Sequence, residues 1–270
     1  MIAHVWVLPA EEVLFAALIF VSPILSGWLY MRGLLALPGI TRAGRRFVAF
    51  VSGVILLMVI FVPPVEAAAD ALFSVHMAQH LVLIVAVPLL FTYSHGLRCL
   101  IMGLPRRVRR LLHPVRRRVQ KWLRWTRWST LPMVAVVFAV TLWAWHLPHL
   151  YDTAIANDFV HLLEHASLFL AGLLLWGAVM EPGRGFLPRA ILIFGTAFHS
   201  GLLGALLVLA PEVLYRAHLS QTLVSMSPLQ DQQLAGLIMW IPMGGVFLVT
   251  LAVMVIRVLE PSDTGLVGDA

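Results

Sequence analysis

The sequence predicts an all-α integral membrane protein, and three observations lead to this fold class. Of its 270 residues, 60% are hydrophobic, and the mean hydropathy is +0.91. Only 12% are charged, about half of the roughly 25% found in soluble domains. The apolar residues also gather in long runs. A soluble fold of this length cannot bury so much apolar surface, so soluble, disordered and disulfide-scaffold proteins are excluded.

The apolar runs define the expected helices. A helix needs about 20 residues to cross the ~30 Å hydrocarbon layer. The first run is not preceded by the positive charge of a secretory signal, so it is counted as a span. We therefore predict a bundle of seven transmembrane helices within a single domain covering 1–270, with spans at 13–31, 47–65, 71–91, 131–147, 159–180, 187–209 and 233–256.

The positive charges set the expected orientation. Lysine and arginine gather in cytoplasmic connections of membrane proteins. Here 18 of the 19 cations fall on alternating connections, and Arg216 is the exception. We therefore expect the N-terminus outside and the C-terminus inside.

Segment 92–130 carries eleven of these cations. Apolar residues such as Leu111 and Trp122 recur between the arginines at roughly helical spacing. This pattern predicts a basic, interfacial amphipathic helix on the anionic lipids of the inner leaflet, interrupted near Pro114. A loop that only fixes the topology, or a specific dock for a lipid or protein, is the alternative. The charge is not spread as a nucleic-acid groove requires, so no nucleic-acid partner is expected.

Nine of the eleven histidines fall on the outer side or in the outer half of a span. At 1.5 Å per residue, His76 and His80 lie roughly 8 and 14 Å below the outer start of the third span. By the same measure His161 and His165 lie about 3 and 9 Å into the fifth span, and His199 about 15 Å into the sixth. Three spans thus carry imidazoles into one layer of the membrane.

Two histidine pairs are spaced i, i+4, which places both rings of each pair on one helical face. Gln79 and Glu164 occupy the i+3 position, where they are expected to orient an imidazole from behind. Ionisable groups inside the membrane usually face a cavity, a partner or a ligand. A lone histidine would suggest a structural hydrogen bond, but the whole set predicts a metal or cofactor site formed by His76, His80, His161, His165, His146 and His199.

Copper is the metal that this donor set favours, because imidazole suits copper and thioether favours Cu(I). Met239 and Met243 are candidate sulfur ligands or access residues, although methionines in apolar helices are more often gap fillers. The single Cys99 excludes a multi-thiolate site. Haem b held by one histidine from each of two helices is an alternative cofactor. His161-x-x-Glu164-His165 also matches a zinc-protease string, but no third ligand lies close, so no enzyme is predicted.

The outer connections add Asp152 and Asp231, which we expect to lie at the entrance of the site or behind its ligands. For segment 227–233 the alternative is helix capping through Ser227, with Pro228 at the first helical position. Spans three and five also share a short pattern, since Val75-His76 and Val160-His161 begin similar strings. A metal or proton transporter is a further alternative function, but the inner halves of these spans are nearly bare of polar groups.

Several strings between about residues 70 and 250 occur in a specific order: His76-x-x-Gln79-His80, Trp145-His146-Leu147-Pro148-x-Leu150-Tyr151-Asp152, His161-x-x-Glu164-His165, Gly204-Ala205-Leu206-Leu207 and Ser227-Pro228-Leu229-x-Asp231-Gln232-Gln233. Together they resemble the CtaG family of multi-span cytochrome c oxidase assembly factors, which are associated with caa3-type oxidases. The resemblance implies a multi-pass protein of the bacterial plasma membrane. It further implies a non-enzymatic factor that handles copper for a haem–copper oxidase subunit.

Overall fold

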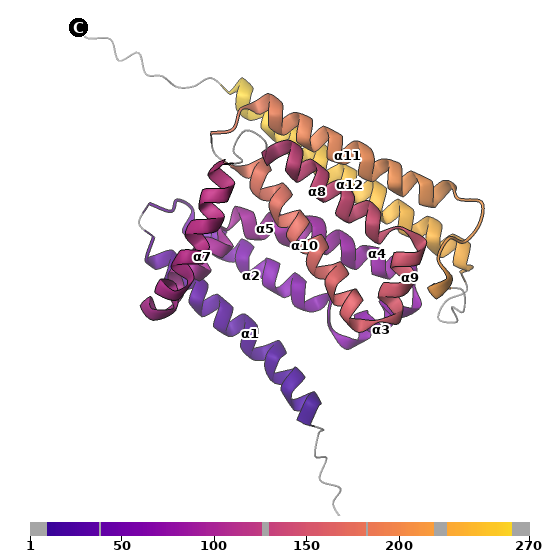
Figure 1. Ribbon diagram of the computed structural model, residues 1–270, viewed down its shortest axis with the longest axis horizontal. Coiled ribbons are helices and arrows are strands. Elements are labelled where there is room, and N and C mark those ends of the chain that lie inside the picture. Colours follow the sequence, from indigo (N-terminus) through magenta and orange to yellow (C-terminus); the bar gives the residue numbers. More distant parts are fainter. Residues whose placement is uncertain (1–9, 38, 126–129, 182, 219–225, 261–270) are drawn as a thin grey trace, which may run out of the picture.

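The computed structural model describes residues 10–37, 39–125, 130–181, 183–218 and 226–260. Within these ranges all regular elements are helical, as predicted. They pack into an elongated bundle in which α11 and α12 run side by side (Figure 1). In chain order the elements are α1 (Ala10–Leu35), α2 (Ala43–Val59), α3 (Pro63–Ala71), α4 (Phe73–Leu81), η1 (Val82–Ala86), α5 (Val87–Tyr93), α6 (Gly96–Gly103), α7 (Arg106–Trp125), α8 (Thr130–Trp145), α9 (Pro148–Ala156), α10 (Asp158–Met180), α11 (Phe186–Leu209), η2 (Arg216–His218) and α12 (Pro228–Leu259).

Four helices in the described part of the chain are long and apolar enough to span a membrane: Phe73–Tyr93, α10, α11 and α12. Two bent pairs, α2 with α3 and α8 with α9, bring the number to as many as six. The chain is thus a multi-pass membrane protein. α1, which covers the first predicted span, is not among these candidates, so seven spans are not confirmed, and the orientation stays a prediction.

One bend lies inside the predicted second span, at Pro63, and the other lies directly after the predicted fourth span, at Pro148. Pro63 begins α3 and Pro148 begins α9, and the residues before them, Val62 and Leu147, are extended. Proline has no N–H to donate and disfavours helical backbone in the preceding residue. The helix axes consequently turn by 58° between α2 and α3 and by 71° between α8 and α9. α3 and α9 therefore lie across the same end of the bundle (Figure 1).

The third predicted span contains a π-helical turn, η1, between α4 and α5. Pro88 cannot donate a hydrogen bond to the carbonyl oxygen of Ile84 four residues earlier, so that oxygen needs another donor. It accepts a hydrogen bond of 3.2 Å from Nε1 of Trp176 in α10. Gly172, one turn earlier in α10, allows the two backbones to approach, because a Cβ there would lie 2.5 Å from the same oxygen. This contact fixes α10 against the helix that carries His76 and His80.

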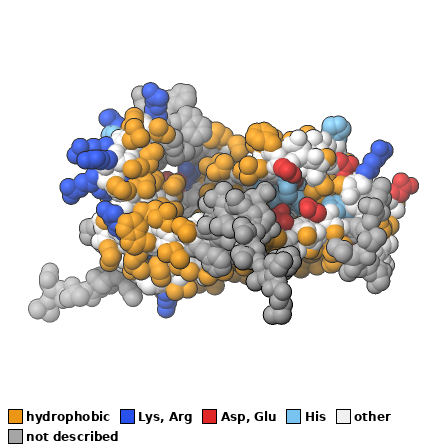
Figure 2. Space-filling model, turned by 90° about the horizontal axis from the view of Figure 1, so that it is seen from below, with side chains coloured by type: hydrophobic (Ala, Val, Ile, Leu, Met, Phe, Trp, Pro, Cys, Tyr) orange, Lys and Arg blue, Asp and Glu red, His pale blue; other side chains and the backbone are white. Residues whose placement is uncertain are grey.

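Between residues 96 and 125, the described part of the basic segment forms two helices, α6 and α7, separated by Pro105. α6 packs against α1. α7 runs through Pro114 as one helix, so the predicted interruption there is wrong. Leu111 and Val115 of α7 are exposed beside its arginines, which suits an interfacial helix, and contact with anionic lipid stays a prediction. Most of the Lys and Arg side chains in view gather at one end of the molecule, and the Asp, Glu and His side chains in view lie toward the other end (Figure 2).

Candidate metal centre

Side chains from α4 and α10 meet in the interior of the bundle. His76 and His80 come from α4, and Glu164 and His165 come from α10. Each offers one ligand atom, and these four atoms lie within 4.8 Å of one another. The i, i+4 spacing places both histidines of α4 on the face that meets α10. We call these four residues the histidine–glutamate centre.

The histidine–glutamate centre is almost completely buried. The exposed fractions are 0% for His76, 1% for His80, 0% for Glu164 and 5% for His165. The Glu164 carboxylate lies between the two histidines of α4, with Oε2 at 3.7 Å from Nε2 of His76 and Oε1 at 3.5 Å from Nε2 of His80. A carboxylate in such a place is costly unless a cation or a proton balances its charge.

The donor atoms of the centre have no hydrogen-bond partner among the described residues. This holds for both ring nitrogens of His76 and His80, both carboxylate oxygens of Glu164, and Nε2 of His165. Buried polar atoms are nearly always hydrogen-bonded in folded proteins. Unsatisfied atoms on four side chains that each bring a ligand atom to within 4.8 Å of the others need a common explanation, and the N and O donors fit a metal ion.

The two i+3 residues differ from their predicted role. Glu164 lies within the centre itself rather than behind an imidazole. Gln79 turns away from the rings, since its Nε2 donates to the carbonyl oxygen of Ile60 at 2.7 Å and to Oε1 of Glu66 at 3.3 Å. Gln79 therefore ties α4 to the end of α2 and to α3.

His161 lies at the edge of the centre. Its ring stacks on that of His76, with centroids 5.2 Å apart and planes inclined by 26°. The His165 ring centroid is 4.2 Å away. His161 is half-buried and is outside the four-residue group. The structure thus brings together the two predicted pairs, with His161 next to the solvent side.

His146 lies behind the centre rather than in it. Its ring centroid is 6.1 Å from that of His80. Nδ1 is 2.6 Å from the carbonyl oxygen of Leu142, and Nε2 is 3.3 Å from Sδ of Met77. Because a carbonyl oxygen only accepts, Nδ1 carries the proton and Nε2 faces the sulfur. These two contacts hold the ring in place.

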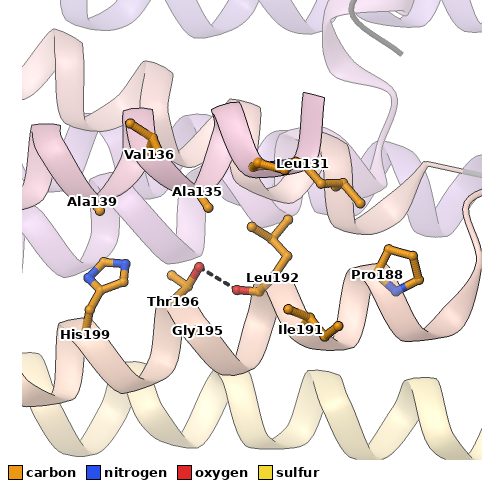
Figure 3. Close-up of a pocket in the computed structure, with 11 residues that line it drawn as sticks. Leu131, Ala135, Val136, Ala139, Pro188, Ile191, Leu192, Gly195, Thr196 and His199 are labelled. Atoms are coloured by element: carbon orange, nitrogen blue, oxygen red, sulfur yellow. Dashed lines mark hydrogen bonds between the residues drawn. The ribbon is translucent and has the colours of Figure 1, made fainter. Parts of the chain in front are cut away.

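His199 lies in another part of the bundle. It lines a groove of about 660 Å³ between α8 and α11, together with apolar residues such as Leu131 and Ile191 (Figure 3). Its nearest ring neighbour is Phe138, with centroids 6.0 Å apart. The structure therefore does not bring His199 to the centre. Equal depth along two spans does not make two side chains face each other, because their rotation about the helix axes also matters.

The two predicted methionines are buried in the main apolar core. Met239 is 2% exposed and Met243 1% exposed, and both belong to the core cluster that contains Trp176 and Phe247. This environment matches the alternative role of gap filling. Met77 is a thioether that does contact an imidazole, since its Sδ lies 3.3 Å from Nε2 of His146.

The predicted aspartates hold helices together. Asp231 of α12 is fully buried, and its carboxylate accepts hydrogen bonds from the N–H groups of Phe73 at 2.7 Å and Ser74 at 3.2 Å. It thus caps the N-terminus of α4 and does not lie at an exposed mouth. Asp152 accepts from the N–H of Ala217 at 3.2 Å. Ser227 caps α12 in a capping box, as the alternative prediction held.

An aromatic wall that the sequence analysis did not predict closes one flank of the centre. It comprises Phe73, Tyr151, Tyr215 and His218. The Tyr151 ring lies 5.3 Å from that of His76, and its hydroxyl lies 2.7 Å from Nε2 of His218. Burial lowers the pKa of His218, which favours the neutral ring that can accept this hydrogen bond. Tyr151 stands in one of the quoted strings, but spacing alone gives no sign of this contact.

An acidic cavity next to His161 and His165 was also missed. Its volume is about 600 Å³, and it is lined by Phe61, Pro63, Glu66, Ala67, Asp70, Asp158, His161, Leu162 and His165. We call it the acidic vestibule. Figure 2 shows acidic and histidine side chains together on the same face of the molecule. The i, i+4 spacing of Glu66 and Asp70 was a usable signal, but nothing in the sequence joins them to Asp158.

The comparisons with known proteins agree with the resemblance seen in the sequence. A family model for the cytochrome c oxidase caa3 assembly factor (Caa3_CtaG) matches residues 28–260. The match contains the whole centre, the aromatic wall and the acidic vestibule. No curated protein and no solved structure matches the chain. The chain belongs to the family of cytochrome c oxidase caa3 assembly factors.

Proposed function

We propose that this protein binds copper at the histidine–glutamate centre and delivers it to a haem–copper oxidase subunit during assembly in the bacterial plasma membrane. One observation carries the proposal. Three buried imidazoles and one buried carboxylate converge with their donor atoms within 4.8 Å and without hydrogen-bond partners in the described structure. The family supplies the context of oxidase assembly.

The donor set supports a metal rather than a structural histidine cluster. A positive ion would balance Glu164 and occupy the lone pairs of His76, His80 and His165 at the same time. Imidazole and carboxylate bind both copper and zinc, and copper binds more tightly in the usual order of divalent metals. A site without thiolates also releases its ion more readily, as delivery requires. A copper centre that holds its cargo temporarily is the function that these residues support best.

The packing around the rings argues against haem b. A haem needs a flat slot between its two axial imidazoles. Here the ring centroids of His76 and His80 are 4.4 Å apart, and those of His80 and His165 are 5.2 Å apart. The stacked ring of His161 covers His76 further. Rings packed this closely between α4 and α10 favour a small ion over a porphyrin.

The residues below the centre argue against a path through the membrane. The buried side chains of η1 and of the following part of α10 are apolar, as Leu83, Ile84, Leu168 and Leu175 illustrate. A translocated ion would find no ligand along this described stretch. We therefore expect the ion to arrive and leave on the same side. Uptake into proteoliposomes above that of protein-free vesicles would instead establish a transporter.

Copper content of the purified protein tests the proposal. The wild type, loaded with excess copper and desalted, should retain about one ion per chain. His76→Ala/His80→Ala should lose more than about nine-tenths of it, since even residues behind metal ligands contribute 10–100-fold to affinity. His199→Ala is the matched control, because it removes an equally deep imidazole outside the centre. Equal copper in the wild type and the double variant would refute the assignment, and a haem α-band would establish the alternative cofactor.

A further inference from the structure

The acidic vestibule places three carboxylates next to the histidine–glutamate centre. Glu66 and Asp70 come from α3, and Asp158 comes from the first turn of α10. Asp70 and Asp158 are exposed, and Glu66 is half-buried. Within the described ranges no lysine or arginine forms an ion pair with any of them. The vestibule is therefore a concentrated negative charge that faces solvent.

A second observation connects the vestibule with the interior. His165 lines the vestibule, yet it is only 5% exposed and belongs to the centre. Its Nε2 has no hydrogen-bond partner among the described residues, and neither has Nε2 of His161 beside it. The His165 ring centroid lies 4.2 Å from His161 and 5.2 Å from His80. The rings of His161, His165 and His80 thus form a series of contacts that leads from the vestibule to the buried donors.

We propose that the acidic vestibule captures a divalent copper ion from solvent, and that His161 and His165 transfer it by ligand exchange to the histidine–glutamate centre. This inference rests on the proposed function of the centre. Carboxylate oxygens are hard donors and favour Cu(II) over Cu(I), whereas imidazole binds copper more tightly than carboxylate does. The donor set changes from exposed oxygens to buried nitrogens along the route. Each exchange therefore leads to a tighter set of ligands.

Aromatic side chains close one flank of the centre. On the other side of His76, the rings of Tyr151, Phe73 and Tyr215 fill the space. Each of these three side chains is at most 2% exposed. Among the described residues, the vestibule therefore offers an ion a way from solvent to His165, whose ring contacts that of Phe61 at 5.5 Å. This makes the vestibule carboxylates important for the rate of loading and unimportant for the final affinity.

The rate of copper uptake distinguishes the two roles. Purified full-length protein is mixed with Cu(II) at low ionic strength, and loading is followed over time by quenching with a chelator. Asp70→Asn/Asp158→Asn should load at least about tenfold more slowly, because clustered charge raises the on-rate of an oppositely charged ligand by 10–10³. The difference should shrink in high salt, where exposed charges are screened. The final copper content should equal that of the wild type.

The matched control removes the same number of charges elsewhere. Glu212→Gln/Glu260→Gln changes two exposed carboxylates outside the vestibule and should load at the wild-type rate. A thermal unfolding curve of each variant establishes that it is folded. Glu66 is left unchanged, because it accepts a hydrogen bond from Gln79.

Two results would overturn the inference while leaving the proposed function intact. One is an unchanged loading rate in Asp70→Asn/Asp158→Asn. The other is normal loading followed by a lower final copper content, which would make these aspartates ligands rather than a capture site. Failure of the proposed function itself has a different signature, since the wild type would then retain no copper at any time.

Discussion

The stretch from α3 to α4 and the stretch from α9 to α10 are built alike, yet the two serve the centre differently. α3 and α9 both have nine residues and begin at a proline, Pro63 and Pro148. Each is followed by one extended residue, Leu72 and Asn157, and then by a histidine helix. The number of residues from the proline to the histidine pair is the same in both. We call them the first and second units; their match extends the short similarity seen in the sequence.

The units differ at the position between the histidines. The first unit has Gln79 and the second has Glu164. Gln79 points back to Ile60 and Glu66, whereas Glu164 points into the centre. At the same position of a similar helix, Gln79 therefore binds neighbouring helices in the first unit, and Glu164 offers a charged ligand atom in the second.

The units differ again one turn into α3 and α9. Here the matched residues are Glu66, which lines the acidic vestibule, and Tyr151, which lies against His76. The centre is consequently open beside α3 and closed beside α9. Two units of similar build thus form a site with a defined direction of access, because one carries a carboxylate and the other an aromatic ring at the matched position.

Exchanging the two i+3 residues should have the largest effect. Glu164→Gln should weaken copper binding more than about a hundredfold, because it removes a donor from the centre itself. The apo form of this variant should unfold at the same or a higher temperature, since it no longer buries an unbalanced carboxylate. Copper titration and thermal unfolding of the apo protein measure both effects.

Gln79→Glu is the counterpart in the first unit. It should leave copper affinity unchanged and lower the unfolding temperature, because it loses the donor to Ile60 and places a second carboxylate next to Glu66. If Gln79→Glu weakened copper binding as much as Glu164→Gln does, the contrast between the units would be broken.

The helix caps provide the next largest effect. In the second unit Asn157 caps its own helix by accepting from the N–H groups of Phe159 and Val160. In the first unit Leu72 cannot do so, and Asp231 from α12 accepts from α4 instead. Asp231→Ala should cost about 2 kcal/mol, since it leaves buried N–H groups unpaired, and Asn157→Ala about 1 kcal/mol.

Chemical unfolding in detergent measures both cap variants. Equal costs would mean that the cap supplied by α12 stabilises α4 no more than a local cap stabilises α10. Copper content of the folded fraction should stay at the wild-type level in both, because neither residue belongs to the centre.

The sequence was sufficient to predict what depends on local patterns. Hydropathy predicted the all-helical membrane fold, and the i, i+4 spacing predicted that the rings of each pair share a face. Similar depth also made a meeting of His76 and His80 with His165 possible, but it did not decide it, as His199 shows. The bend at Pro63 was missed, because the predicted second span, 47–65, runs past that proline. The predicted fourth span ended at residue 147, directly before Pro148, and there only the short helix α9 was not predicted.

Features that depend on how helices are rotated and packed could not be read from the sequence. His199 has the expected depth but faces Phe138, and Asp231 has the expected polarity but is buried as a cap. The vestibule joins α3 to α10, which are far apart along the chain. Tertiary packing alone decides such contacts.

The close contact between the units should be sensitive to one methyl group. At Gly172 of α10 a Cβ would lie 2.5 Å from the carbonyl oxygen of Ile84 and 2.8 Å from Cγ of Pro88. Gly172→Ala should therefore cost about 2 kcal/mol, as overpacking of a rigid contact does. Gly177→Ala in the same helix meets no atom within 4 Å and should be neutral or stabilising. Unfolding curves that rank the two variants in the opposite order would show that the units do not pack in this register.

Tyr151→Phe tests the closed flank with the smallest change. The variant keeps the ring against His76 and removes only the hydroxyl that lies 2.7 Å from Nε2 of His218. We expect a loss of about 1 kcal/mol in unfolding free energy. Tyr93→Phe is the control, because that hydroxyl has no hydrogen-bond partner among the described residues, and it should change stability by less than about 0.5 kcal/mol.

The decisive measurement on Tyr151→Phe is the rate of copper loading. Because the ring still fills the flank beside α9, the rate should stay at the wild-type value while stability falls. Loss of the vestibule aspartates has the opposite pattern, with slower loading and unchanged stability. A faster rate in Tyr151→Phe would mean that solvent reaches His76 past the aromatic wall, and the centre would then have two open flanks. The asymmetry between the units therefore predicts that Tyr151→Phe lowers stability without changing the loading rate, and that Asp70→Asn/Asp158→Asn slows loading without changing stability.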